Sequence, residues 1–267
     1  ISNLWEPHSR ISRINQMLGS KEKHSVNDFM KYQYDFNSPY AEEVTKYIID
    51  AFKGIKVTDY NMIIALDLLE SWDFNMNPES QTPSIYAMFF KYLLKNIFED
   101  EMGENLFNEY VYVANIPYRT VLKLLKENNS TWFNNINTKQ IETRDMIIRK
   151  SLADALYNLE KEFGLKPENW QWGNLHSVTF RHMFSGASSV IDRFVNVGPF
   201  PVGGDGTTVF NTEYLFSKPV GIIAPSQLKP FDAIVGPSMR FIYDFSEPEQ
   251  FHLILPAGQS GNVMSKH

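Results

Sequence analysis

The chain contains no cysteine, which excludes disulfides, thiolate metal sites, iron–sulfur clusters and cysteine nucleophiles together. It has no apolar run approaching the roughly 18 residues that a membrane-spanning helix requires. Basic residues are also few, with 25 Lys and Arg against 31 Asp and Glu, and the net charge is −6. A nucleic-acid binder that neutralises phosphates needs the opposite balance. The sequence therefore predicts no membrane span and no nucleic-acid partner.

What the chain does contain is a composition typical of a globular protein, with 43% hydrophobic and 21% charged residues. Its 267 residues are enough to bury a sizeable core. Residue 1 is Ile, and no basic segment followed by an apolar one marks a secretory leader. The last residues, Ser265 to His267, follow a Gly/Ser-rich turn without a closing element. We therefore expect this sequence to be a piece of a longer chain.

Helical periodicity dominates residues 1–168. Ser38 and Thr82, each followed by a proline, are start signals for two helices. The apolar residues from Ile141 to Phe163 recur in steps of seven, four, four, three and four, which predicts one long helix that ends at Gly164. Further helices are predicted over residues 9–19, 26–35, 58–72 and 117–127.

Strand signals replace helical ones in residues 169–267. Prolines and glycines cluster in 198–206, and short runs rich in β-branched and aromatic residues follow. Helices followed by strands indicate an α+β fold rather than alternating α/β units. Strands are predicted over residues 207–211, 234–235, 241–245 and 252–255.

Two local patterns suggest metal sites but lack the spacing that such sites need. The stretch beginning at Asp73 resembles the start of an EF-hand, but the required glycine and glutamate are replaced by Pro78 and Ser84. His176 and His182 are six residues apart, whereas two ligands on one helical face need a spacing of three or four. A polar loop and ordinary packing histidines are the favoured interpretations.

A third pattern, GGDG at 203–206, lacks the Lys-Ser/Thr of a phosphate loop and follows a proline-rich turn rather than a strand. No Gly-x-Ser-x-Gly motif appears, so a Ser–His–Asp triad stays open but unsupported. Composition and spacing alone therefore lead only to an α+β protein without assigned chemistry.

Five segments, taken in order, carry more information than any one of them. They are LESWD at 69–73, WQWGNLH at 170–176, VGGDGTTVFN at 202–211, GPSMR at 236–240 and LPAGQSGN at 255–262. Their order and spacing resemble the penicillin acylase family of N-terminal-nucleophile hydrolases, and SPY at 38–40 extends the match. The resemblance covers only the C-terminal portion of the family's β chain.

This resemblance implies a precursor that cleaves itself into α and β chains. The new N-terminal residue of the β chain, usually serine, attacks a linear amide, and its own α-amine acts as the base. The implied fold is a four-layer αββα sandwich, which we expect to be incomplete in this chain. Ile1 cannot act as a nucleophile and Ser2 has no free α-amine, so we expect the nucleophile outside these residues.

Two site residues follow from the resemblance. Asn211 matches the asparagine that donates its side-chain amide to the oxyanion, although Phe210 is an extra residue between Val209 and that asparagine. Arg240 matches an arginine near the nucleophile, which orients the asparagine and disfavours a charged α-amine. The alternatives are an asparagine that caps a turn at a strand end and an arginine paired with a carboxylate such as Asp244.

The resemblance also implies the partners and location of the protein. The reaction requires no cofactor, but many members of the family hold a structural calcium, for which Asp73, Asp205 and Asp232 are candidates without a defined ligand set. The expected partners are the remainder of the same precursor and a small acyl-amide substrate, in the periplasm or outside the cell. The competing hypothesis is a non-catalytic structural or binding module derived from the acylase fold.

Overall fold

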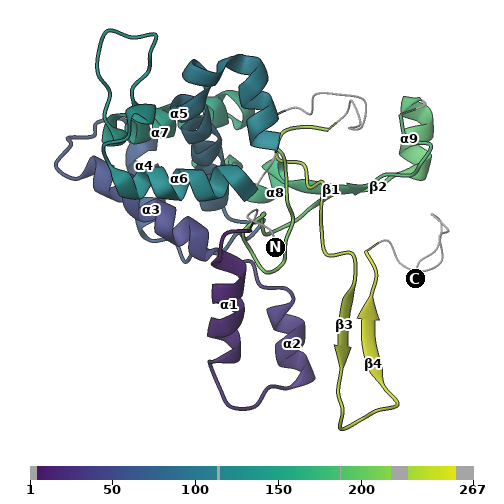
Figure 1. The fold of residues 1–267 in the computed structure, drawn as a ribbon. Helices are drawn as coiled ribbons and strands as arrows, with labels where there is room; N and C mark the ends of the chain where they lie inside the picture. Colours follow the sequence, from purple (N-terminus) through teal and green to yellow (C-terminus); the bar gives the residue numbers. More distant parts are fainter. Residues whose placement is uncertain (1–4, 113–114, 187, 218–227, 257–267) are drawn as a thin grey trace.

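The computed structural model describes residues 5–112, 115–186, 188–217 and 228–256 (Figure 1). A helical body comes first in the chain, and two β-hairpins follow it. The longer helices are α1 Ser9–Leu18, α2 Val26–Tyr32, α3 Pro39–Phe52, α4 Tyr60–Glu70, α5 Thr82–Tyr112, α6 Asn115–Glu127 and α7 Arg144–Phe163. The shorter elements are the 3-10 turns Thr131–Phe133 and Pro167–Asn169, and the helices α8 Trp172–Leu175 and α9 Ser189–Val195. The strands are β1 Ser177–Phe180, β2 Val197–Pro201, β3 Arg240–Tyr243 and β4 Phe251–Ile254.

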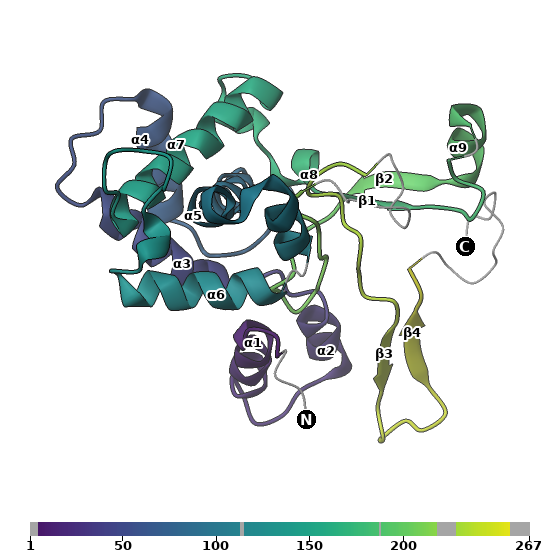
Figure 2. The same ribbon diagram turned by 45° about the horizontal axis from the view of Figure 1, so that its top comes forward.

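Helix α5 forms the centre of the helical body, and Figure 2 shows it surrounded by α3, α4, α6 and α7. Apolar residues four apart along α5, such as Ile85, Phe89, Leu93 and Ile97, are buried. The helix bends at Gly103, whose φ of 71° and ψ of 162° interrupt the helical geometry. Residues with a Cβ rarely adopt such a φ, so a glycine is suited to this break.

The predicted helices are confirmed, with the ends of the four predicted as ranges displaced by at most three residues. Ser38 caps α3 because its Oγ accepts a hydrogen bond from the Ala41 backbone N–H at 2.9 Å. Gly164, with a φ of 86°, follows the last residue of α7 as expected.

The predicted start of α7 at Ile141 is wrong. The backbone N–H of Glu142 donates to the side chain of Asn134 at 3.2 Å, which holds this segment in the preceding loop. Thr143 then caps the helix by accepting a hydrogen bond from the Met146 N–H at 3.4 Å. Ile141 is 81% exposed, so it belongs to the apolar repeat in sequence but not to the buried face of the helix.

The predicted strand over 207–211 is also wrong, because local side chains satisfy its backbone groups. The Thr207 N–H donates to the Asp205 carboxylate at 2.7 Å, and the Thr208 hydroxyl donates to the Phe210 carbonyl at 2.7 Å. These short polar side chains satisfy the backbone groups locally, so the segment forms a turn rather than pairing with another strand. Asn211 consequently does not lie at the end of a strand.

The other strand predictions were partly correct. Residues 234–235 form no strand, although the neighbouring Ala233 makes isolated bridges to Val178 and Tyr214. The 241–245 prediction corresponds to β3, which ends at Tyr243 because the Asp244 side chain accepts from the Ser246 N–H at 2.8 Å and forms a turn. The 252–255 prediction corresponds to β4 within one residue at each end.

The sequence patterns did not predict strands β1 and β2. Strand β2 contains Gly198 and Pro199, residues that weaken a strand prediction, and all five of its residues are exposed. The two strands pair antiparallel, with Val178 opposite Phe200.

Within the described ranges, β1–β2 and β3–β4 are separate two-stranded antiparallel sheets. The β1–β2 pair, whose strands are joined through α9, extends away from the helical body, whereas β3 lies beside α2 (Figures 1 and 2). The α+β class is therefore confirmed, whereas no four-layer sandwich is assembled in this part of the chain. None of the helices in the described residues is both long and apolar enough to cross a membrane.

Candidate oxyanion site

The GGDG segment forms a buried polar turn. Gly204 has a φ of 83°, and a Cβ at this position would clash with the Phe210 carbonyl oxygen. The Asp205 carboxylate is buried and accepts hydrogen bonds from both the N–H and the hydroxyl of Thr207, each at 2.7 Å. Burial raises the pKa of Asp205, and the hydrogen bonds from Thr207 partly oppose this rise.

Hydroxyl groups connect this turn to the helical body. The Ser38 and Thr207 hydroxyl oxygens are 2.7 Å apart, and the Ser9 hydroxyl donates to the Thr207 carbonyl at 3.1 Å. Because the Thr207 proton goes to Asp205, the Ser38 hydroxyl must be the donor to Thr207. The turn is therefore fixed to the start of α1 and to the N-cap of α3.

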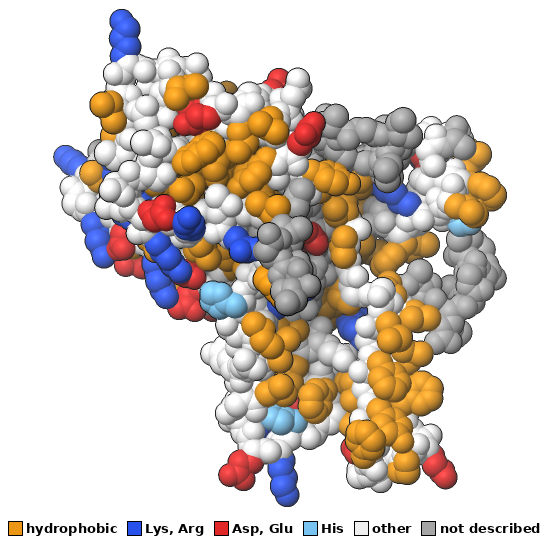
Figure 3. All heavy atoms as spheres, viewed as in Figure 1, with side chains coloured by type: hydrophobic (Ala, Val, Ile, Leu, Met, Phe, Trp, Pro, Cys, Tyr) orange, Lys and Arg blue, Asp and Glu red, His pale blue; other side chains and the backbone are white. Residues whose placement is uncertain are grey.

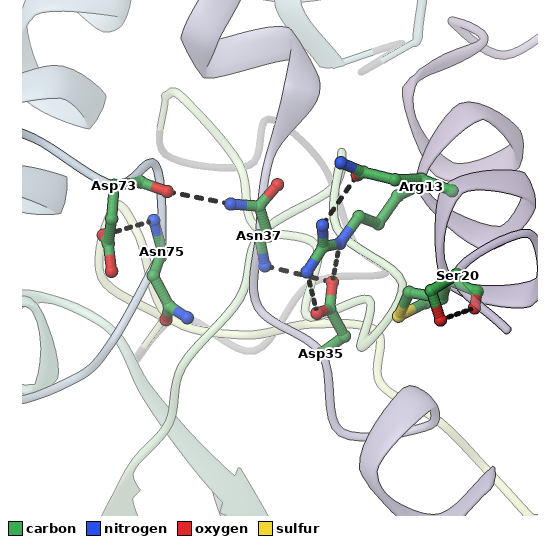
Figure 4. Close-up of polar contacts among 8 residues, drawn as sticks. Arg13, Ser20, Asp35, Asn37, Asp73 and Asn75 are labelled. Atoms are coloured by element: carbon green, nitrogen blue, oxygen red, sulfur yellow. Dashed lines mark hydrogen bonds and ion pairs between the residues drawn. The ribbon is translucent and has the colours of Figure 1, made fainter. Parts of the chain in front are cut away.

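The segment after α2 also contacts this region, and Figure 4 shows the polar contacts of its Asp35 and Asn37. Arg13 forms a two-point ion pair with Asp35, with Nε and Nη2 at 2.9 and 2.7 Å from the two carboxylate oxygens. The Asp35 side chain also accepts from the Asn37 N–H at 3.3 Å. The Asp35 carbonyl accepts from the Phe210 N–H at 3.0 Å, so this ion pair fixes the residue next to Asn211.

The EF-hand-like stretch at Asp73 is an ordinary loop between helices. Its carbonyl accepts from the Asn37 side chain at 2.9 Å, and its carboxylate accepts from the Asn75 N–H at 2.9 Å (Figure 4). The carboxylate thus closes a short turn in its own loop.

Asn211 is half-buried beside the turn. Its Nδ2 donates a long hydrogen bond of 3.3 Å to the Gly206 carbonyl, whereas its buried Oδ1 has no partner in the part of the chain that the structure describes. A buried amide oxygen without a partner is costly. The contact with Gly206 is also what a turn-capping asparagine would make, so both sequence hypotheses for this residue remain.

Arg240 begins β3 and faces the aromatic side chains near Asn211. Its guanidinium carbon lies 5.4 Å from the Phe210 ring centroid and 6.0 Å from that of Tyr34. The alternative pairing with Asp244 is wrong, because Asp244 is exposed and its carboxylate accepts from the N–H and hydroxyl of Ser246. In the described ranges, Arg240 forms no ion pair, and no hydrogen bond joins it to Asn211.

His176 is a core residue. Its ring stacks on Trp172 with centroids 4.6 Å apart, and its Nδ1 lies 2.5 Å from the Phe231 carbonyl oxygen. Burial lowers the pKa of His176 to about 4, so the ring is neutral at pH 7. His182 is exposed and its Nδ1 accepts from the Phe184 N–H at 3.2 Å. The two histidines therefore have separate structural roles, as the spacing indicated.

The candidate calcium ligands do not come together. Asp73 and Asp205 close turns in their own loops, and Asp232 accepts from the Lys229 N–H at 2.9 Å and from the Ser177 hydroxyl at 3.4 Å. No group of three or more acidic or histidine side chains suited to a metal ion occurs among the residues that the structure describes. These aspartates therefore do not fit a shared calcium site.

Comparison with known proteins assigns the family. The penicillin amidase family model matches residues 1–267, so the chain belongs to that family, and the resemblance inferred from the five segments is confirmed. Over 294 aligned positions it is 28% identical to the acyl-homoserine lactone acylase QuiP of Pseudomonas aeruginosa, covering 100% of this chain and 33% of that protein. The protein of the same name from Pseudomonas fluorescens Pf0-1 is also 28% identical, with 99% and 32% covered. The chain thus spans about a third of the length of the curated relatives it matches.

Proposed function

We propose that this chain is part of an acylase that hydrolyses linear acyl amides through an acyl-enzyme on an N-terminal serine outside these residues. The observation that carries the proposal is the family match over residues 1–267, together with relatives named as acyl-homoserine lactone acylases. Because those relatives are about three times longer, the proposed partner of this chain is the remainder of the same self-cleaving precursor.

In the proposed reaction, the serine oxygen attacks the amide carbonyl carbon, and its proton passes to the α-amine of the same residue. The carbonyl oxygen becomes an oxyanion, to which the Asn211 side chain donates a hydrogen bond. The C–N bond then breaks, and the proton moves from the α-amine to the departing amine. Water hydrolyses the resulting ester by the same route, so no cofactor takes part.

The surroundings of Asn211 are compatible with this role. Its Nδ2 carries two protons, and among the described residues only one long hydrogen bond, to Gly206, uses them. The other N–H is a neutral donor on a turn that Ser38, Asp35 and Thr207 hold in place. A fixed donor of this kind is what oxyanion stabilisation requires.

Arg240 is proposed to act through charge. A permanent cation close to the α-amine disfavours a second positive charge and so keeps the amine in its basic, neutral form.

The exposed apolar surface supports the proposed partner. Figure 3 shows hydrophobic side chains gathered over the β3–β4 hairpin at the lower right. Phe241 and Phe251 are 46% and 59% exposed on one face of this hairpin, and Phe194 and Phe200 are exposed near the other hairpin. Surfaces of this kind mark protein interfaces. We propose that the rest of the precursor covers them and completes the αββα sandwich.

For the substrate class, we propose N-acyl homoserine lactones, the class in the relatives' names. From the family resemblance, we propose a periplasmic or extracellular location. A structural calcium in the full-length enzyme would take its ligands elsewhere, because Asp73, Asp205 and Asp232 do not converge.

A second candidate function, a non-catalytic module, is favoured by one observation. Asn211 donates a hydrogen bond to Gly206 and the Arg240 guanidinium lies over the Phe210 ring, so both side chains already have structural partners.

Product analysis of the full-length protein separates these candidates. Incubation with an N-acyl homoserine lactone should release a fatty acid and the free amine of homoserine lactone. Opening of the lactone with the amide intact, or no turnover by a correctly cleaved precursor, would contradict the proposal.

A further inference from the structure

Three aromatic side chains form a cluster between α2 and the GGDG turn. The ring centroid of Phe210 lies 4.9 Å from that of Tyr34 and 5.3 Å from that of Phe36, both in edge-to-face arrangements. The centroids of Tyr34 and Phe36 are 4.7 Å apart. Phe210, the residue that interrupts the expected Thr-Val-Asn pattern, is thus the shared member of a packed cluster.

Arg240 contacts two of the three rings in this cluster. Its guanidinium carbon is 5.4 Å from the Phe210 centroid and 6.0 Å from the Tyr34 centroid, whereas it has no such contact with Phe36 in the described part of the chain. Phe36 therefore shares the packing of Phe210 but not its contact with the cation. This difference provides a matched control.

The backbone on each side of the contact is fixed. Arg240 pairs with Ile254 of β4, and the Gln33 side chain donates to the neighbouring Phe241 carbonyl at 3.0 Å. On the other side, the Phe210 N–H donates to the Asp35 carbonyl, and Phe210 is only 8% exposed. The ring therefore offers a rigid surface to the guanidinium.

Among the described residues, no hydrogen bond or ion pair engages the Arg240 guanidinium. Arg240 forms no ion pair with a described carboxylate, and a cavity of about 210 Å³ opens beside it, lined by Tyr34, Ile242, His252 and other residues of α2 and the hairpin. A cation–π contact needs no carboxylate partner, so the two rings can hold the guanidinium in place by themselves.

We propose that Phe210 and Tyr34 are positioning residues that hold the Arg240 guanidinium beside the segment of Asn211 through cation–π contacts. This inference rests on the proposed function for its catalytic consequence. The extra residue at position 210 then has a definite role, since it connects the segment of Asn211 to Arg240 without a hydrogen bond between the two.

The first test uses the pH dependence of kcat/KM in the full-length protein. Phe210→Leu removes the aromatic face but keeps apolar volume. It should move the acidic limb to higher pH by on the order of half a unit, in the same direction as Arg240→Ala, because the amine loses its fixed cation. Phe210→Tyr should restore the profile, and Phe36→Leu should leave it unchanged. An unshifted profile in Phe210→Leu, or an equal shift in Phe36→Leu, would overturn the proposal.

The second test needs no activity, so it separates failure of this proposal from failure of the proposed function. Thermal unfolding of the full-length protein is measured for Arg240→Met, Phe210→Leu and their combination. The Tm losses should be less than additive for this pair and additive when Phe36→Leu replaces Phe210→Leu. Additive losses with Phe210 would overturn the positioning role. A correctly cleaved wild-type protein without acylase activity would overturn the proposed function and the catalytic consequence together.

Discussion

Asp205 and His176 are ionisable side chains buried in the protein interior, and their environments differ. Asp205 accepts two short hydrogen bonds from Thr207 and has a structural role in its turn. His176 has one hydrogen bond, to a carbonyl oxygen, and its Nε2 has no partner within the described residues. A charge on His176 would therefore be poorly compensated, whereas the Asp205 carboxylate has donors.

His176 should make the protein less stable in mild acid. Its pKa is lowered from 6.5 to about 4, mainly by burial, so the unfolded state binds more protons between these values. This contribution to stability is complete above pH 6.5 and is lost as the pH falls, by roughly 3 kcal/mol near pH 4. Denaturant unfolding at several pH values measures the slope.

His176→Phe is the control for this prediction, because it keeps an aromatic ring but cannot titrate. Glu101, whose pKa is raised to about 7 by partial desolvation and by the neighbouring Asp100 carboxyl, titrates in the same window with the opposite sign, so the wild type must be compared with the variant. Equal slopes in the two proteins would show that His176 does not determine the acid sensitivity.

Replacement of Asp205 by asparagine should destabilise the protein less than replacement by alanine. Asp205→Ala leaves the Thr207 N–H and hydroxyl without their acceptor in a buried turn, at a cost of about 2–4 kcal/mol. Asp205→Asn keeps one acceptor oxygen in place and should cost less. Denaturant unfolding of the two variants measures these losses in the free energy of unfolding. Equal losses would mean that the hydrogen bonds to Thr207 are not the stabilising feature.

For the helices, capping residues and prolines predicted the ends correctly, because their effect on the backbone lies within one helical turn. Ser38-Pro39 marked the start of α3, and Gly164 marked the end of α7. The prediction failed where the backbone at a helix end is bonded by a side chain more distant in the sequence. The Asn134 contact that removes Ile141 from α7 is eight residues from its partner, Glu142, and no local pattern reveals it.

The candidate site could be predicted only in part. The motif order indicates Asn211 and Arg240 as candidates, but the β-rich composition of this segment favoured a strand where the Asp205 and Thr208 side chains form a turn. The contact between Phe210 and Arg240 joins residues 30 positions apart, and only the packing of α2 against β3 reveals it.

The N-cap of α3 is predicted to matter more than an exposed cap of the same chemistry. Ser38 is fully buried, accepts from the Ala41 N–H and donates to Thr207, whereas Ser25 caps α2 at the surface. Ser38→Ala should therefore cost about 2 kcal/mol or more, and Ser25→Ala about 1 kcal/mol. Chemical denaturation provides both values, and equal losses would argue against a structural link between α3 and the turn.

At the scale of the whole molecule, the helical body has its own buried core, but the hairpins do not. Phe241, Tyr243 and Phe251 lie on one face of the β3–β4 hairpin and are at least 36% exposed. An apolar face of this kind normally finds a partner. In the proposed full-length enzyme, that partner is the rest of the precursor.

The isolated 267-residue chain should therefore self-associate. Phe251→Glu should increase the monomer fraction, because it places a charge on the apolar face of the hairpin, whereas Tyr60→Glu on the helical body should not. Light scattering coupled to size exclusion measures the molecular mass. A monomer at every concentration tested would contradict the prediction.

Asn211 is proposed to be the oxyanion donor of the full-length acylase, and the decisive measurement is the acylation rate of that enzyme. Single-turnover kinetics with an acyl amide should show acylation slowed by roughly 100- to 1000-fold in Asn211→Ala, with substrate affinity changed far less, because the donor acts on charge formed in the transition state. Asn211→Asp should be at least as harmful, since it presents an acceptor to the oxyanion. Wild-type acylation kinetics in a folded, correctly cleaved Asn211→Ala enzyme would contradict the claim.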